Sequence, residues 1–121
     1  MVNFKTQVTI IGGGPSGLLL SQLLMNEGIE TIVLEKHTKS HVLSRIRAGV
    51  LESGTVEILK QAGVGKRIDV DGFVHDGTYL SSENKGFRIS FSETIGKSVT
   101  IFGQTEVTKD LFQTQEERGA N

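Results

Sequence analysis

The chain has 121 residues, enough for one small domain with a hydrophobic core. Its 13 lysines and arginines are balanced by 14 aspartates and glutamates, a formal charge of −1 that argues against nucleic-acid or acidic-membrane partners. It has no cysteine, no long apolar run and no signal-peptide pattern, so we predict no metal site, no membrane-spanning helix and a cytoplasmic location.

The first predicted unit begins with a strand and a glycine-rich turn. The apolar, β-branched run at residues 8–11 predicts a strand buried on both faces. Gly12, Gly14 and Gly17 follow in G-x-G-x-x-G register. In such a turn the first glycine allows a sharp bend, the second allows close approach of a diphosphate, and the third allows tight helix–sheet packing. The free N–H groups and the positive dipole end of the next helix then face the phosphates.

A helix and a second strand complete this unit. Pro15 lies in the first helical turn, and Gly28 suits a left-handed C-cap. A strand at residues 31–34 ends in Glu35, at the separation from the glycines that a ribose-binding acid needs. The alternative is a glycine-rich turn that binds nothing. It is disfavoured because a strand, the glycine motif, a capped helix, a second strand and a terminal acid occur in that order. The apolar stripe that should face the sheet consists of Leu19, Leu20, Leu23 and Leu24.

A polar stretch at residues 36–44, with room for one short helical turn, precedes an arginine-containing segment. Arg45 and Arg47 are two residues apart in a segment predicted to be extended, so both guanidinium groups can reach one polyanionic ligand. The small residues Ala48 and Gly49 would permit close approach of a flat cofactor. The alternative is a pair of arginines solvated on a loop, and the glycine motif upstream favours ligand contact.

The remaining pattern predicts two helices and three strands. In the predicted hairpin, Phe87, Ile89 and Phe91 should point inward while Arg88 and Ser90 point outward. The elements are, in order, a helix over 51–62 ending at Gly63, an irregular stretch or short turn at 64–70, strands at 73–80 and 86–91 joined by a loose loop at 81–85, a strand at 98–102, and a helix over 105–118 with Val107 and Leu111 on one face and Gly119 as C-cap.

The fold class predicted from these elements is α/β, a Rossmann-like βαβ unit with a parallel sheet and a small antiparallel hairpin. A parallel sheet needs another strand after each crossover helix, yet the sequence stops two residues after Gly119. We therefore expect residues 1–121 to be the N-terminal part of a nucleotide-binding domain that is truncated before completion.

Several segments together resemble one enzyme family. They read GGGPSGLLLSQLL, VLEK, RIRAGVLESGTVEILKQAGV, DGFVHDG and VTIFGQTEVTKDL. They resemble the N-terminal third of the para-hydroxybenzoate hydroxylase family of class A FAD-dependent aromatic monooxygenases, from Thr6 to about Gly119. RIRAGVLE and GQTEVT are far more specific than the glycine motif. The resemblance implies an FAD-binding domain whose substrate domain lies outside this chain. It also implies an enzyme that uses NADPH, FAD and O2 to convert 4-hydroxybenzoate into 3,4-dihydroxybenzoate.

The resemblance also implies residue roles. The glycine turn with Ser16 would hold the FAD diphosphate, Glu35 the adenosine ribose, and the arginine segment the flavin, with Arg47 on the diphosphate side. Gln104 would bind FAD as well, although its position alone indicates only a polar cap on the last helix. The implied FAD-binding residues are Gly12, Gly14, Ser16, Gly17, Glu35, Arg45, Ile46, Arg47, Ala48, Gly49, Val50 and Gln104.

Three further residues acquire roles from the same resemblance. His75 matches the outer end of a proton path that deprotonates the substrate phenol, and a histidine suits a relay because its ordinary pKa lies near neutrality. The alternative is a strand histidine that makes one hydrogen bond. Lys36 and His41 fall in the NADPH contact segment, where close relatives have arginine and tyrosine. Lysine lacks the planar fork of arginine, so the choice between NADPH and NADH stays open.

Two other functional classes are compatible with the pattern. One is a nicotinamide-dependent dehydrogenase module, and the other is a non-catalytic unit whose exposed sheet edge pairs with another chain. We expect the 121-residue chain alone to be inactive and to hold FAD weakly. Because the sheet edge is unpaired, we also expect self-association or a companion C-terminal fragment.

Overall fold

The computed structural model describes residues 3–120, whose seven strands form three small sheets. No helix in this range is both long and apolar enough to cross a membrane. The elements are β1 (Val8–Ile11), α1 (Pro15–Asn26), β2 (Thr31–Leu34), α2 (Lys39–Ser44), β3 (Val50–Glu52), α3 (Ser53–Gln61), α4 (Lys66–Asp71), β4 (Phe73–His75), β5 (Gly77–Ser82), β6 (Lys85–Ser90), α5 (Phe91–Ile95), β7 (Val99–Ile101) and α6 (Gln104–Glu117).

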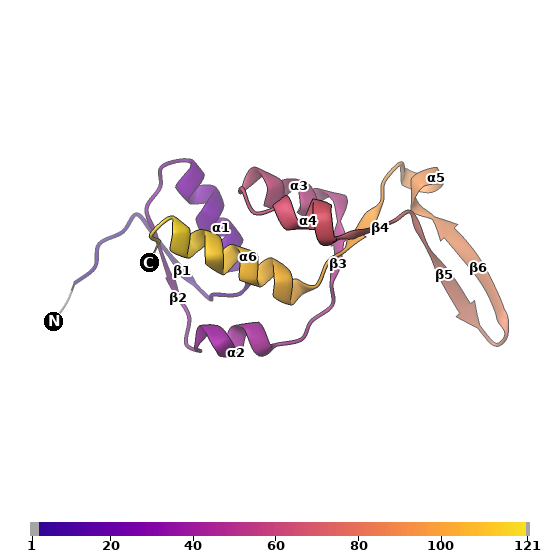
Figure 1. The fold of residues 1–121 in the computed structure, drawn as a ribbon, viewed down its shortest axis with the longest axis horizontal. Coiled ribbons are helices and arrows are strands. Elements are labelled where there is room, and N and C mark those ends of the chain that lie inside the picture. Colours follow the sequence, from indigo (N-terminus) through magenta and orange to yellow (C-terminus); the bar gives the residue numbers. More distant parts are fainter. Residues whose placement is uncertain (1–2, 121) are drawn as a thin grey trace.

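The first sheet is the predicted parallel pair, β1 with β2, in a register that aligns Val8 with Thr31 and Ile11 with Leu34. The crossover helix α1 packs beside α6, and α3 and α4 lie next to them (Figure 1). The hydrophobic core forms where these four helices meet the end of β7. Its buried members are Leu18, Leu59, Ala62, Val64, Ile68, Phe102, Val107 and Leu111.

The second sheet is antiparallel, with β7 between β3 and β4. Ile101 faces both Val50 and Phe73 across this sheet. β3 follows the arginine segment directly, and α6 begins soon after β7. The sheet therefore brings the arginine segment beside the start of α6.

The third sheet is the hairpin β5–β6, which projects from the body of the molecule together with α5 (Figure 1). Its turn is tighter than the loose loop predicted at 81–85. Only Glu83 and Asn84 lie between the strands, with φ of 48° and 65°. Positive φ at both central residues is typical of a type I′ turn, whose twist matches that of the flanking strands.

The strand predicted at 73–80 is divided in two, because the chain changes sheets at Asp76 between β4 and β5. The Asp76 carbonyl accepts the N–H of Phe91 at 2.7 Å, and this bond joins the end of β4 to the start of α5. The inward pattern predicted for the next strand also fails. Phe87 is 61% exposed, because no layer covers the projecting hairpin among residues 3–120. Phe91 belongs to α5 rather than to the strand.

The predicted leucine stripe of α1 is confirmed only in part, because Leu19 and Leu23 pack against the core as half-buried residues. Leu20 is 45% exposed, while Leu18, Ser21 and Gln22 are buried. The Ser21 and Thr31 hydroxyl groups lie 2.5 Å apart, so small polar residues let α1 approach β2 closely. The expectation that the first strand is buried on both faces fails too, because only one face is covered and Ile11 is 80% exposed.

Other element boundaries differ less. Residues 51 and 52 belong to β3 rather than to the predicted helix, which begins at Ser53. The stretch predicted at 64–70 as irregular or a short turn overlaps the helix α4, which ends at Asp71, and α5 was not predicted. The short turn predicted within 36–44 is confirmed as α2, and the last helix and its buried Val107 and Leu111 are confirmed as α6.

Candidate functional site

A pocket of about 230 Å3 lies where the parallel sheet, the arginine segment and α6 meet. Two of its walls come from the glycine turn and from the loop after β2, and the others come from α2, the arginine segment and the first turns of α6. It is lined by Gly14, Pro15, Glu35, His37, Val42, Arg45, Arg47, Gln104 and Thr108.

The glycine turn forms one wall with an uncapped helix end. Gly12 has φ of +114°, and its N–H donates to the Leu34 carbonyl at 2.8 Å, which confirms the sharp bend between β1 and α1. No side chain caps α1 at Gly14, and a methyl group there would meet no atom within 4 Å. The N–H groups of the first turn are therefore available to an anion. A methyl group on Gly17 would overlap the Gly12 carbonyl oxygen, which confirms its packing role.

Glu35 follows β2 and turns its carboxylate toward the glycine turn. One oxygen accepts the N–H of Gly13 at 2.8 Å, and the other accepts the N–H of His37 at 2.9 Å. The hydrogen bond from His37, followed by that from Gly13, lowers the pKa of Glu35, so the side chain is a carboxylate at neutral pH. An ionised acid in this position can accept hydrogen bonds from ribose hydroxyl groups.

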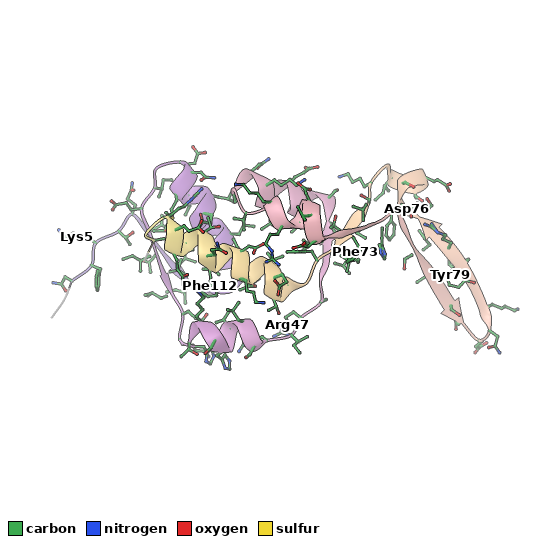
Figure 2. The ribbon with its side chains drawn as sticks, in the orientation of Figure 1. Lys5, Arg47, Phe73, Asp76, Tyr79 and Phe112 are labelled. Carbon is green, nitrogen blue, oxygen red and sulfur yellow. The ribbon has the colours of Figure 1, made fainter. Side chains whose placement is uncertain are left out.

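Arg45 and Arg47 lie in the extended stretch between α2 and β3, where Figure 2 labels Arg47. Both line the pocket, whereas Ile46 between them is 93% exposed. Among residues 3–120 they form no ion pair, unlike Arg67 and Arg88. Two guanidinium groups without carboxylate partners beside an uncapped helix end form a site suited to a diphosphate.

The structural roles of Gln104 and Gly49 differ from those inferred from the residues alone. The N-cap of α6 is Gly103, and no side chain makes a capping bond there, so the polar-cap interpretation of Gln104 is wrong and its side chain lines the pocket instead. A methyl group on Gly49 would lie 2.7 Å from the Gly103 Cα, so Gly49 is required by backbone packing. Ala48 is exposed.

The pocket gathers only part of the predicted set. It includes Gly14, Glu35, Arg45, Arg47 and Gln104. Its lining also includes His37, Val42 and Thr108, which the sequence pattern did not indicate. His37 lies three residues past the end of β2 and two past Glu35, so its side chain can face the same edge of the sheet. The predicted residues that do not line it are Gly12, Ser16, Gly17, Lys36, His41, Ile46, Ala48, Gly49, Val50 and His75.

Two of those residues lie on other elements. His41 is on α2, and its ring stacks on that of His37 with 4.2 Å between centroids. His75 ends β4, opposite Val99 in β7, and is exposed. The structure therefore places His75 in the second sheet, apart from the pocket residues.

Comparison with known proteins identifies the family. Residues 5–121 match the family described as FAD binding domain. This chain belongs to that family. It is 48% identical over 120 residues to the p-hydroxybenzoate hydroxylase of Acinetobacter baylyi, covering 98% of this chain and 30% of that relative. It is 25% identical over 108 residues to pentachlorophenol 4-monooxygenase of Sphingobium chlorophenolicum, covering 86% and 20%.

Solved structures share the fold. The chain superposes on PqsL of Pseudomonas aeruginosa in complex with 2-aminobenzoylacetate with a TM-score of 0.83 at 15% identity, covering 94% of this chain and 31% of that one. For p-nitrophenol 4-monooxygenase PnpA of Pseudomonas putida the TM-score is 0.79 at 20% identity, covering 97% and 30%. The chain thus spans between 20% and 31% of the length of these proteins.

The residues present fit the adenosine diphosphate part of FAD. The uncapped end of α1 and two guanidinium groups that form no ion pair within residues 3–120 suit the diphosphate, and Glu35 suits the ribose. A methyl group on Gly12 or Gly14 would meet no atom within 4 Å, so both positions leave open space. Together with the family match, this arrangement favours the flavin interpretation over the nicotinamide-dependent dehydrogenase.

Proposed function

We propose that this chain holds the adenosine diphosphate half of FAD in a flavin-dependent monooxygenase. In this proposal the whole protein uses NADPH or NADH and O2 to hydroxylate 4-hydroxybenzoate to 3,4-dihydroxybenzoate. The observation that carries the proposal is the pocket that groups Glu35, Arg45, Arg47 and Gln104 at the uncapped end of α1. The 48% identity to the A. baylyi hydroxylase supports the choice of substrate.

Each pocket residue has a defined task in this proposal. The N–H groups at the start of α1 and the guanidinium groups of Arg45 and Arg47 bind the diphosphate, while Glu35 accepts hydrogen bonds from the ribose. Gln104 donates from its amide to the dinucleotide. FAD supplies the redox chemistry, accepting hydride from the nicotinamide and activating O2. This chain contributes binding and orientation.

Residues outside the pocket complete the proposal. His75 is exposed on β4 and can exchange a proton with solvent, as the outer end of a path to the substrate phenol requires. Lys36 precedes His37 in the chain and His41 stacks on the His37 ring, and both are proposed to contact the nicotinamide nucleotide. By itself, the 121-residue chain is proposed to be inactive and to bind FAD weakly. It is also proposed to associate with a second copy or a companion C-terminal fragment.

The test begins with the purified protein that carries this chain. We expect a yellow protein that releases FAD on denaturation and oxidises NADPH faster when 4-hydroxybenzoate is added, with 3,4-dihydroxybenzoate identified by chromatography. The Glu35→Gln variant should lose FAD on dilution. Glu27→Gln, a matched change at the exposed end of α1, should retain it. Absence of bound flavin would refute the FAD proposal, and flavin without a response to 4-hydroxybenzoate would refute the substrate.

A further inference from the structure

His37 is the histidine that lines the pocket, and no role was expected for it. It is half-buried and shares the pocket with Glu35, Arg45 and Arg47. Its ring stacks on that of His41 at 4.2 Å with an interplanar angle of 24°. The first turn of α2 places His41, since its N–H donates to the hydroxyl of the N-cap residue at 3.2 Å. The stack therefore holds the His37 ring against α2.

The groups around His37 disfavour its protonated form while no anionic ligand is bound in the pocket. Partial burial is the main cause that lowers the pKa of His37, followed by the positive charges of His41, Lys36 and Arg45. Glu35 acts in the opposite direction but more weakly than His41 and Lys36. The other pocket residues on α1, α2 and α6 are uncharged: Gly14, Pro15, Val42, Gln104 and Thr108. His37 is therefore mainly neutral at physiological pH.

We propose that His37 is a third cationic ligand of the FAD diphosphate and that it takes up a proton from solvent when the diphosphate binds. This inference rests on the proposed FAD site. A diphosphate diester carries two negative charges, so its arrival reverses the sign of the electrostatic potential at the imidazole. The protonated ring then donates an N–H to a phosphate oxygen, as a charge-assisted hydrogen bond. No bond other than N–H is formed or broken.

Proton uptake makes FAD affinity depend on pH with a definite sign. Binding raises the pKa of His37, so affinity falls as pH rises through the interval between the free and bound values, by up to about tenfold per pH unit. We expect FAD to bind about 3- to 10-fold more weakly at pH 8 than at pH 6. Glu35 contributes nothing to this change because its pKa lies below its usual value, and both arginines stay charged.

The experiment measures proton uptake directly. Apoprotein carrying this chain is titrated with FAD by flavin fluorescence between pH 6 and 8 at constant ionic strength. Calorimetry at pH 7 in two buffers of different ionisation enthalpy counts the protons taken up. In the wild type, we expect a dissociation constant that rises with pH and a positive proton uptake. His37→Gln should abolish both.

A second variant should shift the pH dependence of FAD binding rather than abolish it. His41→Phe keeps a stacked ring and removes a like charge that lowers the pKa of His37, so its pH dependence should move to higher pH. The inference is overturned if His37→Gln keeps the wild-type profile, or weakens FAD equally at every pH as a merely structural residue would. A wild type that binds FAD with no pH dependence overturns this inference alone. A wild type that binds no FAD overturns the proposed function as well.

Discussion

Gly17→Ala should destabilise the protein, although alanine is the better helix former. A methyl group at this position would overlap the Gly12 carbonyl oxygen and lie 3.2 Å from Ile10 Cγ2. These atoms belong to the turn and strand held by β1–β2 pairing, where the Gly12 N–H donates to Leu34 at 2.8 Å. The overlap cannot be relieved by a rotamer change, so α1 has to move away from the sheet.

The magnitude follows from two opposing contributions. Overpacking against fixed backbone costs about 3 kcal/mol, the upper end of the usual range. Replacing glycine within a helix returns about 1 kcal/mol. We therefore expect the free energy of unfolding to fall by about 2 kcal/mol, which lowers Tm by about 6 to 12 °C for a domain of this size. Urea unfolding followed by circular dichroism measures it.

Gly54→Ala is the matched control, because Gly54 lies in the first turn of α3 and a methyl group there would meet no atom within 4 Å. This variant should be more stable than wild type by about 0.5 to 1 kcal/mol. The reasoning is refuted if Gly17→Ala is as stable as wild type, or if both variants change stability in the same direction by similar amounts.

Three further changes test the core, the pocket and the ion pairs that Glu106 forms with Arg67 and Lys109. Leu111→Ala removes a side chain that is 0% exposed, and urea unfolding should show a loss of about 2 to 5 kcal/mol. Arg47→Gln removes one unpaired guanidinium group, and fluorescence titration should show FAD affinity about 10-fold lower or more. Hydrogen bonds from Lys109 and Arg67 lower the pKa of Glu106, so the stability it contributes is present above pH 4.5, its usual pKa, and is lost as pH falls further. The stability difference between wild type and Glu106→Gln should therefore shrink below pH 4.5.

Matched variants separate these effects from general damage. Leu20 lies on α1, which packs beside α6, but it is 45% exposed. Leu20→Ala should therefore lose far less stability than Leu111→Ala. Arg88→Gln, on the projecting hairpin, should leave FAD affinity unchanged. For Glu106, the same stability difference at pH 7 and pH 3 would contradict the stated cause.

The site residues that the sequence predicted best depend on local geometry. The bend at Gly12 and the close packing at Gly17 are backbone requirements that neighbouring residues determine. Glu35 directly follows β2, whose last residue pairs with Ile11, so β1–β2 pairing is enough to place it beside the turn. Arg45 and Arg47 share a pocket because residues two apart in an extended chain point the same way.

The errors arise from contacts between distant segments. Residues 51 and 52 were predicted as helix, because β3 depends on its pairing with β7, which lies far along the chain. The inward assignment of Phe87 assumed a covering layer, yet the hairpin projects away from the helices (Figure 1). In α1, hydrophobic periodicity favoured the leucines, whereas the contact between Ser21 and Thr31 determines which face meets the sheet. His37 was missed for the same reason, since its role depends on where α2 lies.

The backbone hydrogen bond between Gly49 and Phe102 helps to preorganise the arginine segment for its ligand. The Gly49 carbonyl accepts the Phe102 N–H at 2.8 Å, so the irregular arginine stretch is tethered at one end by α2 and at the other by the start of α6. Less backbone conformational entropy is then left for a nucleotide to remove, and less of its binding energy is consumed in ordering a loop. Cutting the chain ahead of β7 would release that tether and leave the arginines attached to a disordered arm.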